Sequence, residues 1–444
     1  MYLLMSLYVL YFSTNVLLMS PAVMGTIFGA SRIWDAISDP VVGYWSDRTG
    51  ARLGRRRSWM LASIVPIALF FLMVFSAPAN LSATALIVWM TIAVIGFYAV
   101  ATMLFVPQMS LGAELSVDYH ERSKLYGARH GFYTLGSIGA LGSMYLFTNS
   151  GDLPLVELRS LITEHAAFAG LALAVLVLFA VIRLRERPEF QGRAAQSPFS
   201  AFRDVWGNPH ARLLILVTFI ENIGGAAIGV LTLFIAEYVV GAPQHAALII
   251  LCYMVPSTIL VPIWAPLSRR YSKKTMWMFS MILTGLSFGG MISLLFMDTL
   301  TLRLWTISIL AATAGIAAGC GGTISPSVQS DVIDYDEYET GERKEGTYFA
   351  AWNFVYKSAY GVMLLLTGYV LSLSGFVPKV EQTMTVKWAM LILYGAFPFV
   401  CYLTGAWLFS KFRLNEAEHN RIRIELARRV QENEGIANQT AAPT

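Results

Sequence analysis

Apolar stretches close to 20 residues long recur along almost the whole chain of 444 residues. An α-helix needs about 20 apolar residues to cross the roughly 30 Å hydrocarbon core of a membrane, where only internally paired backbone groups are tolerated. Only 14% of the residues are charged, against about a quarter in soluble domains. We therefore predict an all-α polytopic membrane protein with twelve transmembrane helices. The predicted spans cover residues 1–20, 22–46, 59–79, 83–110, 125–148, 162–183, 212–239, 244–267, 275–297, 303–323, 346–374 and 386–410.

The loops on the two sides of these predicted spans differ sharply in charge. One set of alternate loops, taken with the C-terminal tail, holds 25 of the 32 Lys and Arg residues. The other set holds only Arg159, Arg303, Lys379 and Lys387. Short cytoplasmic loops carry an excess of basic residues. We therefore predict that the basic loops and both termini are cytoplasmic.

Two short basic loops occupy matching positions in the two parts of the chain. GYWSDRTGARLGRRR follows the second predicted span and APLSRRYSKKT follows the eighth. Such duplication is typical of secondary transporters, whose site lies near mid-membrane between the repeats. Because the first span begins at residue 1 without a polar flank, we expect its start to be truncated. The predicted parts are an N-terminal six-helix half (1–183), a cytoplasmic linker (184–211), a C-terminal six-helix half (212–410) and a cytoplasmic tail (411–444).

Three charged residues fall inside the second predicted span. Arg32, Asp35 and Asp39 are spaced i, i+3 and i+7, so they project from one face of the helix. Intramembrane charges are costly and usually mark ion or substrate pathways. Pro40 frees a backbone carbonyl next to the carboxylates, and with the Ser38 hydroxyl these oxygens suit a hard cation. An internal Arg32–Asp35 salt bridge with a purely structural role is the alternative.

Lys357 in the eleventh predicted span is the natural counter-charge to this group. Together with Arg32, Asp35 and Asp39 it makes a set of zero net charge. An entering cation would compete with the lysine for the carboxylates. Since the two spans belong to different halves, making or breaking that pairing would bias how the halves move. Asn353 lies one turn earlier on the same predicted face.

Other polar groups leave two interpretations open. Glu221 and the following Asn222 lie in the seventh predicted span. They are interpreted either as substrate contacts or as groups that hydrogen-bond to another helix. Arg129 lies near a cytoplasmic end, where its side chain can also reach the headgroups. The acidic segment 330–346 is interpreted as a solvated cytoplasmic loop, or as a source of gating contacts with the arginines after the second span.

Several of these segments together resemble one family over essentially the whole chain. RIWDAISDP, DYHERSKLYGAR and DVIDYDEYETGERKEGTYFAAWNFVYK are similar to signatures of the glycoside–pentoside–hexuronide:cation symporters of the major facilitator superfamily. The family is typified by the melibiose permease. GYWSDRTG also fits the superfamily's G-x-x-x-D-R-x-G loop. The resemblance implies a major facilitator fold and cation-coupled transport.

The resemblance also implies roles for individual residues. Asp35, Asp39, Ser38 and Thr102 match the cation site, which would hold Na⁺ if the protein is sodium-coupled, and Arg32 and Lys357 match the adjoining charge network. The candidate cytoplasmic gate residues are Asp47, Arg48, Asp118, Arg122, Asp331 and Asp334. By the resemblance, Phe105 stands where an aspartate of the permease grips the sugar hydroxyls, and Met109 stands where its tryptophan stacks on the sugar, which weakens the sugar assignment. The tentative substrate-binding residues are Phe105, Met109, Arg129, Glu221 and Asn353.

These observations predict a secondary active transporter rather than an enzyme, without a cofactor other than the coupling ion, Na⁺ or H⁺. The expected substrate is a small polar solute: a sugar, glycoside or uronide. The first alternative is a cation-coupled transporter of an amphipathic anion such as a lysophospholipid, and the second is a non-transporting membrane sensor or scaffold. We expect a monomer in a bacterial inner (plasma) membrane that binds its substrate, its coupling cation and lipid but no nucleic acid. Sequence alone leaves open the exact substrate, the direction of transport and Na⁺ against H⁺.

Overall fold

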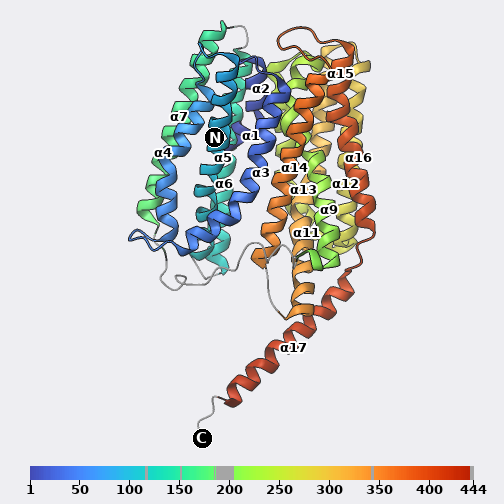
Figure 1. The fold of residues 1–444 in the computed structure, drawn as a ribbon. Coiled ribbons are helices and arrows are strands. Elements are labelled where there is room, and N and C mark those ends of the chain that lie inside the picture. The colour runs from blue at the N-terminus through green and yellow to red at the C-terminus, as the bar shows by residue number, and fades with distance from the viewer. Residues whose placement is uncertain (116–118, 151–152, 185, 187–204, 342–344, 441–444) are drawn as a thin grey trace.

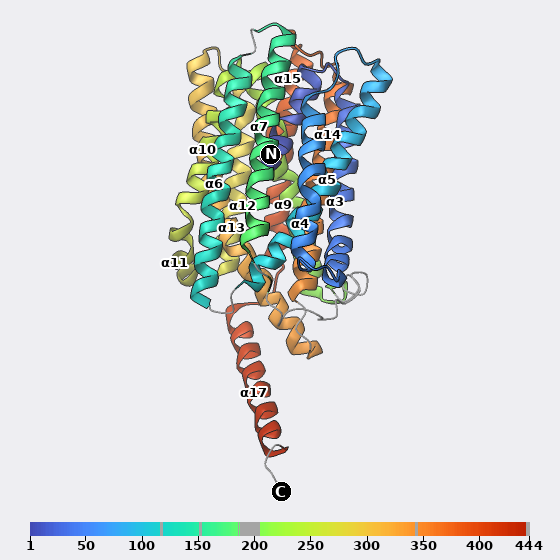
Figure 2. The same ribbon diagram turned by 90° about the vertical axis from the view of Figure 1, so that its left-hand side faces the viewer.

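The computed structural model is a bundle of long helices that run roughly parallel to one another, with one helix extending beyond the bundle (Figures 1 and 2). It describes the chain except residues 116–118, 151–152, 185, 187–204, 342–344 and 441–444. No strand occurs among the described residues. The predicted all-α membrane fold is confirmed, and all twelve predicted spans coincide with helical segments. Within the described part of the chain, eight helices are by themselves long and apolar enough to cross a membrane.

The helices from the first part of the chain lie together on the left of Figure 1. Pro21 begins α3 at a position where its missing N–H costs nothing, and the Ser82 hydroxyl caps α5 by accepting from the Ala85 N–H at 3.3 Å. The helices are α1 (Tyr2–Leu7), α2 (Val9–Asn15), α3 (Pro21–Arg48), α4 (Arg55–Phe75), α5 (Ala83–Glu114), α6 (Tyr119–Asn149) and α7 (Leu155–Arg183).

The helices from the second part of the chain lie on the right of Figure 1. The Asn208 side chain caps α9 by accepting from the N–H groups of His210 at 2.9 Å and Ala211 at 3.2 Å. The helices are α9 (Pro209–Phe234), η2 (Ile235–Val240), η3 (Pro243–His245), α10 (Ala246–Ile259), α11 (Val261–Tyr271), α12 (Lys273–Gly290), η4 (Met291–Phe296), α13 (Leu300–Thr340), α14 (Glu345–Leu373), α15 (Met384–Leu391), η5 (Ile392–Ala396), α16 (Phe397–Ser410) and α17 (Glu416–Thr440).

One predicted boundary was wrong. The segment 330–340, expected as part of a solvated loop, continues α13 as a helix until Gly341 ends it with a φ of +74°. In the connector after α7, most of which lies outside the described residues, the Glu186 carboxylate accepts from the N–H groups of Arg55, Arg56 and Arg57 at 2.8–3.0 Å. A carboxylate at a helix N-terminus satisfies unpaired donors and complements the helix dipole.

Helices α3 and α14 cross in very close contact and join the two parts of the chain. A Cβ added at Gly25 would lie 2.8 Å from the Leu364 carbonyl oxygen and 2.9 Å from the Gly368 Cα. A Cβ at Gly361 would lie 3.0 Å from the Arg32 Cβ. Small residues let membrane helices approach closely, where packing rather than the hydrophobic effect holds them together. This crossing brings Arg32, Asp35 and Asp39 next to α14.

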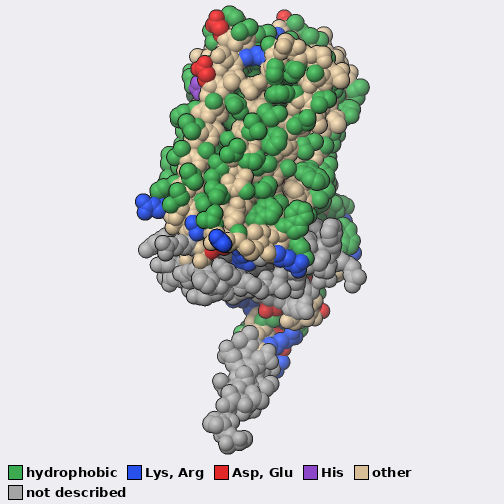
Figure 3. All heavy atoms as spheres, turned by 60° about the vertical axis from the view of Figure 1, so that its left-hand side comes forward, with side chains coloured by type: hydrophobic (Ala, Val, Ile, Leu, Met, Phe, Trp, Pro, Cys, Tyr) green, Lys and Arg blue, Asp and Glu red, His purple; other side chains and the backbone are tan. Residues whose placement is uncertain are grey.

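The surface of the bundle is apolar along its flank and basic at one end. Figure 3 shows hydrophobic side chains over the flank and Lys and Arg side chains near the end from which α17 extends. Phe168, Leu171 and Leu176 on α7 are each at least 65% exposed. Exposed apolar side chains of this size face lipid in a membrane protein. The protein is therefore an integral membrane protein.

Candidate functional site

Three oxygen-bearing side chains form a small hydrogen-bonded group between α3 and α5. The Thr102 hydroxyl donates to Asp35 Oδ1 at 2.9 Å, and the Thr102 and Ser38 hydroxyl oxygens lie 3.2 Å apart. Asp35 is 2% exposed and Thr102 is 1% exposed. The structure thus brings together residues that were grouped on separate grounds: Thr102 by resemblance, Asp35 by helical spacing and Ser38 by its hydroxyl oxygen next to Asp39.

The Lys357 ammonium group lies between the two carboxylates. Its Nζ is 2.6 Å from Asp39 Oδ2 and 2.9 Å from Asp35 Oδ2. The side chain of Asp39 is 26% exposed, while that of Asp35 is 3% exposed. Buried carboxylates without a counter-charge would be strongly destabilising. The lysine therefore compensates one of the two negative charges, with Arg32 supplying the second positive charge nearby, and Asp39 is the more accessible of the two carboxylates.

Arg32 is held by a cage of side chains from other helices. Its guanidinium donates to the Tyr2 hydroxyl at 2.5 Å and to Ser6 Oγ at 2.8 Å. The guanidinium carbon lies over the rings of Tyr98 at 4.2 Å and Tyr360 at 4.8 Å. The predicted salt bridge to Asp35 is long, at 4.0 Å. Cation–π contacts and hydroxyl acceptors, more than Asp35, stabilise this buried charge.

Sequence reasoning missed most of this cage. Tyr2, Ser6 and Tyr98 lie on α1 and α5, far from Arg32 in the sequence. Tyr360 lies on α14, three residues after Lys357. The available signal was the buried arginine itself, because a guanidinium in a membrane needs several acceptors. The need for acceptors does not identify the helices that supply these acceptors.

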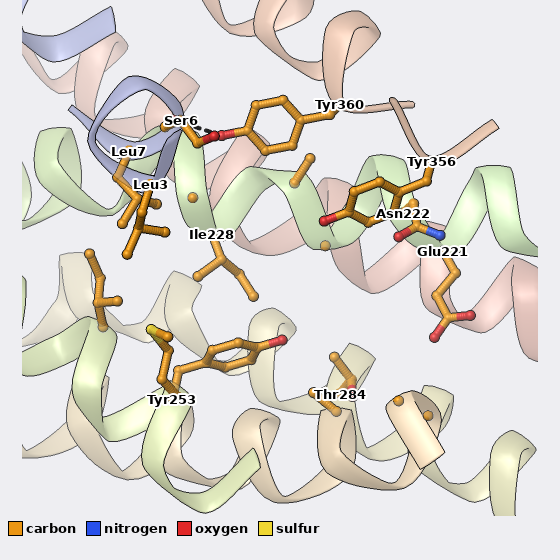
Figure 4. Close-up of a pocket in the computed structure, with 18 of the residues that line it drawn as sticks. Leu3, Ser6, Leu7, Glu221, Asn222, Ile228, Tyr253, Thr284, Tyr356 and Tyr360 are labelled. Carbon is orange, nitrogen blue, oxygen red and sulfur yellow. Dashed lines mark hydrogen bonds between the residues drawn. The ribbon is translucent and has the colours of Figure 1, made fainter. Parts of the chain in front are cut away.

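A central cavity of about 410 Å³ adjoins this charge network. Arg32 and Lys357 belong to its wall. Glu221 and Asn222 of α9 also line it (Figure 4). Its volume falls within the roughly 300–1,000 Å³ that is usual for small-molecule sites. Six tyrosines contribute rings or hydroxyls to its wall: Tyr2, Tyr133, Tyr253, Tyr356, Tyr360 and Tyr402. The arrangement can hold a small solute by hydrogen bonds and aromatic faces next to the carboxylates.

The five tentative substrate residues do not all reach this cavity. Glu221 lines it, and Phe105 packs edge-on against the ring of Tyr2, which also lines it, at 5.4 Å between centroids. Met109, Arg129 and Asn353 are exposed and are not among the residues that line it.

Among the gate candidates on the first half, Arg48 contacts its own helix. It donates to the hydroxyl of Tyr44, and its guanidinium carbon lies 3.9 Å from the centre of that ring. The remaining candidates fall outside the part of the chain whose side chains the structure describes: Asp47, Asp118 and Arg122.

The gate candidates on α13 contact the C-terminal part of the chain. Lys273 Nζ lies 2.7 Å from Asp331 Oδ2. His419 Nε2 of α17 lies 3.0 Å from Asp334 Oδ2 and 3.5 Å from Asp331 Oδ1. The Lys273 contact attaches α12, and the His419 contacts attach α17, to the extension of α13.

Comparison with known sequences finds membrane transporters that are similar to this chain over most of its length. A family model described as MFS/sugar transport protein matches residues 1–416. The chain is 25% identical to the inner membrane symporter YicJ of Escherichia coli, covering 91% of this chain and 86% of the relative. It is 25% identical to the isoprimeverose transporter of Lactiplantibacillus pentosus, covering 97% and 89%. It is 24% identical to the sodium-dependent lysophosphatidylcholine symporter 1-A of Danio rerio, covering 95% and 85%.

Comparison with solved structures supports the fold. The crystal structure of a D-xylose-proton symporter aligns with a TM-score of 0.65 at 14% identity, covering 92% of this chain and 93% of that one. At such low identity the similarity shows the fold alone.

Proposed function

Because the chain belongs to the MFS/sugar transport protein family, whose members are membrane transporters, we propose that it is a cation-coupled symporter that works by alternating access. The observation that carries this proposal is the position of the Lys357 ammonium group, 2.6 Å and 2.9 Å from the Asp39 and Asp35 carboxylates. The ammonium group occupies the place that a coupling cation would take. The relatives named as symporters agree with this function.

Coupling follows from the charges of the site. Arg32, Lys357, Asp35 and Asp39 sum to zero, so a bound cation leaves one positive charge in excess and favours release of Lys357. The lysine belongs to α14 and the carboxylates to α3, so its release removes an ion pair between the two parts of the chain. A cation that breaks the ion pair between Lys357 and the carboxylates binds one arrangement of α3 and α14 more tightly than the other. Such a difference in affinity is what shifts the populations of two conformations.

The solute site in this proposal is the central cavity. Tyrosine hydroxyls, Asn222 and Glu221 supply hydrogen-bonding groups, and the tyrosine rings offer apolar faces. A sugar, glycoside or uronide combines hydroxyls with C–H faces and fits such a wall. The isoprimeverose transporter among the relatives points to the same class of solute.

A lysophospholipid-like anion is the second candidate. Phe105 and Met109 are 37% and 49% exposed near Tyr2 and along α5, and they would offer an apolar surface to an acyl chain. The relative named as a lysophosphatidylcholine symporter favours this alternative.

Sidedness and assembly complete the proposal. We place both termini in the cytoplasm of a bacterial cell and the bundle in its inner membrane, since Lys and Arg gather at the end from which α17 extends (Figure 3). We also propose that the chain divides into halves at 1–183 and 212–410. In the same proposal the protein is a monomer and binds no nucleic acid.

The experiment that tests this function measures thermal stabilisation of the purified protein. A cation at about 100 times its dissociation constant stabilises the folded state by about 2.7 kcal/mol. We expect Na⁺ to raise the melting temperature while K⁺ at equal ionic strength does not, and the rise to disappear in Asp39→Asn. A proton-coupled protein would instead gain no stability from Na⁺ and would depend on pH.

The same assay distinguishes the candidate solutes. Methyl glucoside, methyl glucuronide and lysophosphatidylcholine are added with and without the cation. We expect a glycoside to stabilise the protein further, and stabilisation by lysophosphatidylcholine alone would favour the second candidate. No stabilisation by any cation over the whole pH range would contradict coupled transport.

A further inference from the structure

A second and larger cavity, of about 830 Å³, lies at the end of the bundle opposite α17. We call it the outer vestibule and define it by Asn15 of α2, Glu237 of η2, Arg303 of α13, Lys379 and Glu381 of the loop before α15, and Lys387 of α15. Residues from both parts of the chain therefore form its wall.

The outer vestibule gathers the scarce basic residues of its side of the protein. The sequence places only four Lys and Arg residues in the loops of that side. Three of them line the vestibule: Arg303, Lys379 and Lys387. The fourth, Arg159, is not among the described residues that line it, and it donates to the Ala77 carbonyl. The topology thus concentrates positive charge in one cavity.

The positive charge of this wall is only partly compensated. The Arg303 guanidinium donates to the backbone carbonyls of Met297 at 2.8 Å and Val239 at 3.2 Å, which fix its position without cancelling its charge. Lys387 pairs with Glu381 at 3.6 Å, but the Glu381 side chain is 91% exposed, so water screens this pair. With Glu237 counted as ionised, the described charged residues that line the vestibule sum to +1.

The loop that carries Lys379 is held in a defined conformation. Lys379 has a φ of +59°, which non-glycine residues rarely adopt. Its N–H donates to the Tyr238 hydroxyl at 3.1 Å, and that hydroxyl donates to the buried Asn15 Oδ1 at 2.5 Å. The Gln382 amide donates to the carbonyls of Val377 at 2.5 Å and Val380 at 2.7 Å. A strained backbone conformation that several hydrogen bonds hold in place indicates that the loop is fixed for binding.

The vestibule is separate from the central cavity. Among the described residues the two cavities have no lining residue in common. Leu7 lines the central cavity while the next residue, Tyr8, lines the vestibule. The aromatic packing of Tyr11 on Phe234, at 5.6 Å between centroids, lies in the layer between α2 and α9. This aromatic layer therefore separates a solute in the vestibule from the central cavity.

We propose that the outer vestibule binds the carboxylate of an acidic glycoside through Arg303 and Lys379, before the solute reaches the central cavity. The inference rests on the proposed transport function and narrows its substrate class to anionic glycosides. Guanidinium groups bind carboxylates in bidentate geometry, and a positive cavity raises the local concentration of anions and their association rate. The buried Asn15 Nδ2 has no hydrogen-bond partner among the described residues and is available for a sugar hydroxyl.

The test compares two probes that differ only in the carboxylate, methyl β-D-glucuronide and methyl β-D-glucoside. Binding to the full-length protein in detergent is measured by isothermal titration at low and high salt. We expect tighter binding of the glucuronide, weakening with salt because the attraction is electrostatic. Arg303→Gln and Lys379→Gln should each weaken glucuronide binding about tenfold, as loss of a charge-assisted hydrogen bond implies, without changing glucoside binding.

Arg159→Gln is the matched control, because it removes the remaining basic residue of the same side. It should bind the glucuronide like the parent. Arg303→Lys keeps the charge and should restore part of the affinity even if Arg303→Gln is poorly folded. Equal binding of the two probes by the parent, or equal losses in Arg159→Gln and Arg303→Gln, would overturn the proposal.

The variant Asp39→Asn separates this proposal from the proposed function. Glucuronide binding through Arg303 should survive in Asp39→Asn, since the vestibule does not include the cation site. If the parent binds the glucuronide in this way but no cation stabilises it, the vestibule proposal is supported while coupled transport is contradicted.

Discussion

At the scale of single residues, the site depends on a few oxygen atoms held in place by neighbours. Thr102 donates to Asp35 at 2.9 Å and lies 3.2 Å from the Ser38 hydroxyl, with all three side chains buried. Its hydroxyl orients the least accessible carboxylate and is itself a candidate cation ligand.

Replacement of Thr102 by valine removes only the hydroxyl and keeps the shape of the side chain. An unsatisfied buried group costs about 1–3 kcal/mol, so we expect the cation dissociation constant to rise about tenfold. Thr102→Ser keeps the hydroxyl and should bind within about twofold of the parent. Isothermal titration with Na⁺ measures both, and a parent-like affinity in Thr102→Val would exclude Thr102 from the site.

Much of this residue-scale arrangement was predictable. Helical spacing placed Arg32, Asp35 and Asp39 on one face, and charge balance identified Lys357 as their partner. The side chains around Arg32 were not predictable, because they come from helices whose rotation about their own axes is not fixed by hydropathy. For the same reason Asn353, one turn from Lys357, was assigned to the site but is exposed outside the cavity wall.

At the scale of helices, the crossing of α3 and α14 is the contact most sensitive to side-chain size. A Cβ at Gly368 would meet the Pro21 carbonyl oxygen and would lie 2.9 Å from the Gly25 Cα. These are backbone atoms, which cannot rotate away as a flexible side chain can. The two helices must therefore separate to accept even a methyl group.

We expect Gly368→Ala to slow transport by disfavouring the arrangement in which α3 and α14 are closely packed. Overpacking costs about 1–3 kcal/mol, which corresponds to a shift of about 5- to 150-fold in a two-state equilibrium. The initial rate of uptake into vesicles measures the effect. Gly142→Ala on α6 is the control, because nothing lies within 4 Å of a Cβ there. Equal rates for the two variants would refute the role of the crossing.

Hydropathy located the helices but not their ends. The apolar part of α13 was predicted to stop at residue 323, yet the helix continues to Thr340. The extra turns combine polar residues with buried Val332 and Ile333, and they are stabilised by contacts with α17, including the bond from Arg429 to the Tyr338 carbonyl at 2.9 Å. Such tertiary contacts override a boundary drawn from composition. The break at Tyr8 between α1 and α2 was missed for a similar reason, since both sides of it are apolar.

At the scale of the whole molecule, the charge network joins the two parts of the chain at one point. The carboxylates come from α3, the ammonium group comes from α14, and the central cavity lies beside both. In the proposed function, cation binding, the release of Lys357 and the relative movement of the helices are linked steps, and this linkage drives accumulation of the solute.

The replacement Lys357→Ala tests that linkage at the level of transport. Without the ammonium group, cation binding no longer changes an ion pair between α3 and α14. We expect the variant to exchange solute across the membrane but to lose accumulation driven by the cation gradient. Lys411→Ala removes an exposed lysine that stacks on Trp407 and should behave as the parent.

The most direct measurement is solute accumulation in proteoliposomes under an imposed inward gradient of Na⁺ and, separately, of H⁺. The solute is the glycoside that stabilises the purified protein most. The parent should concentrate it inside the vesicles under one of the two gradients, while Lys357→Ala and Asp39→Asn should only equilibrate it. Accumulation to the parent's level by both variants would contradict coupling through Lys357 and Asp39.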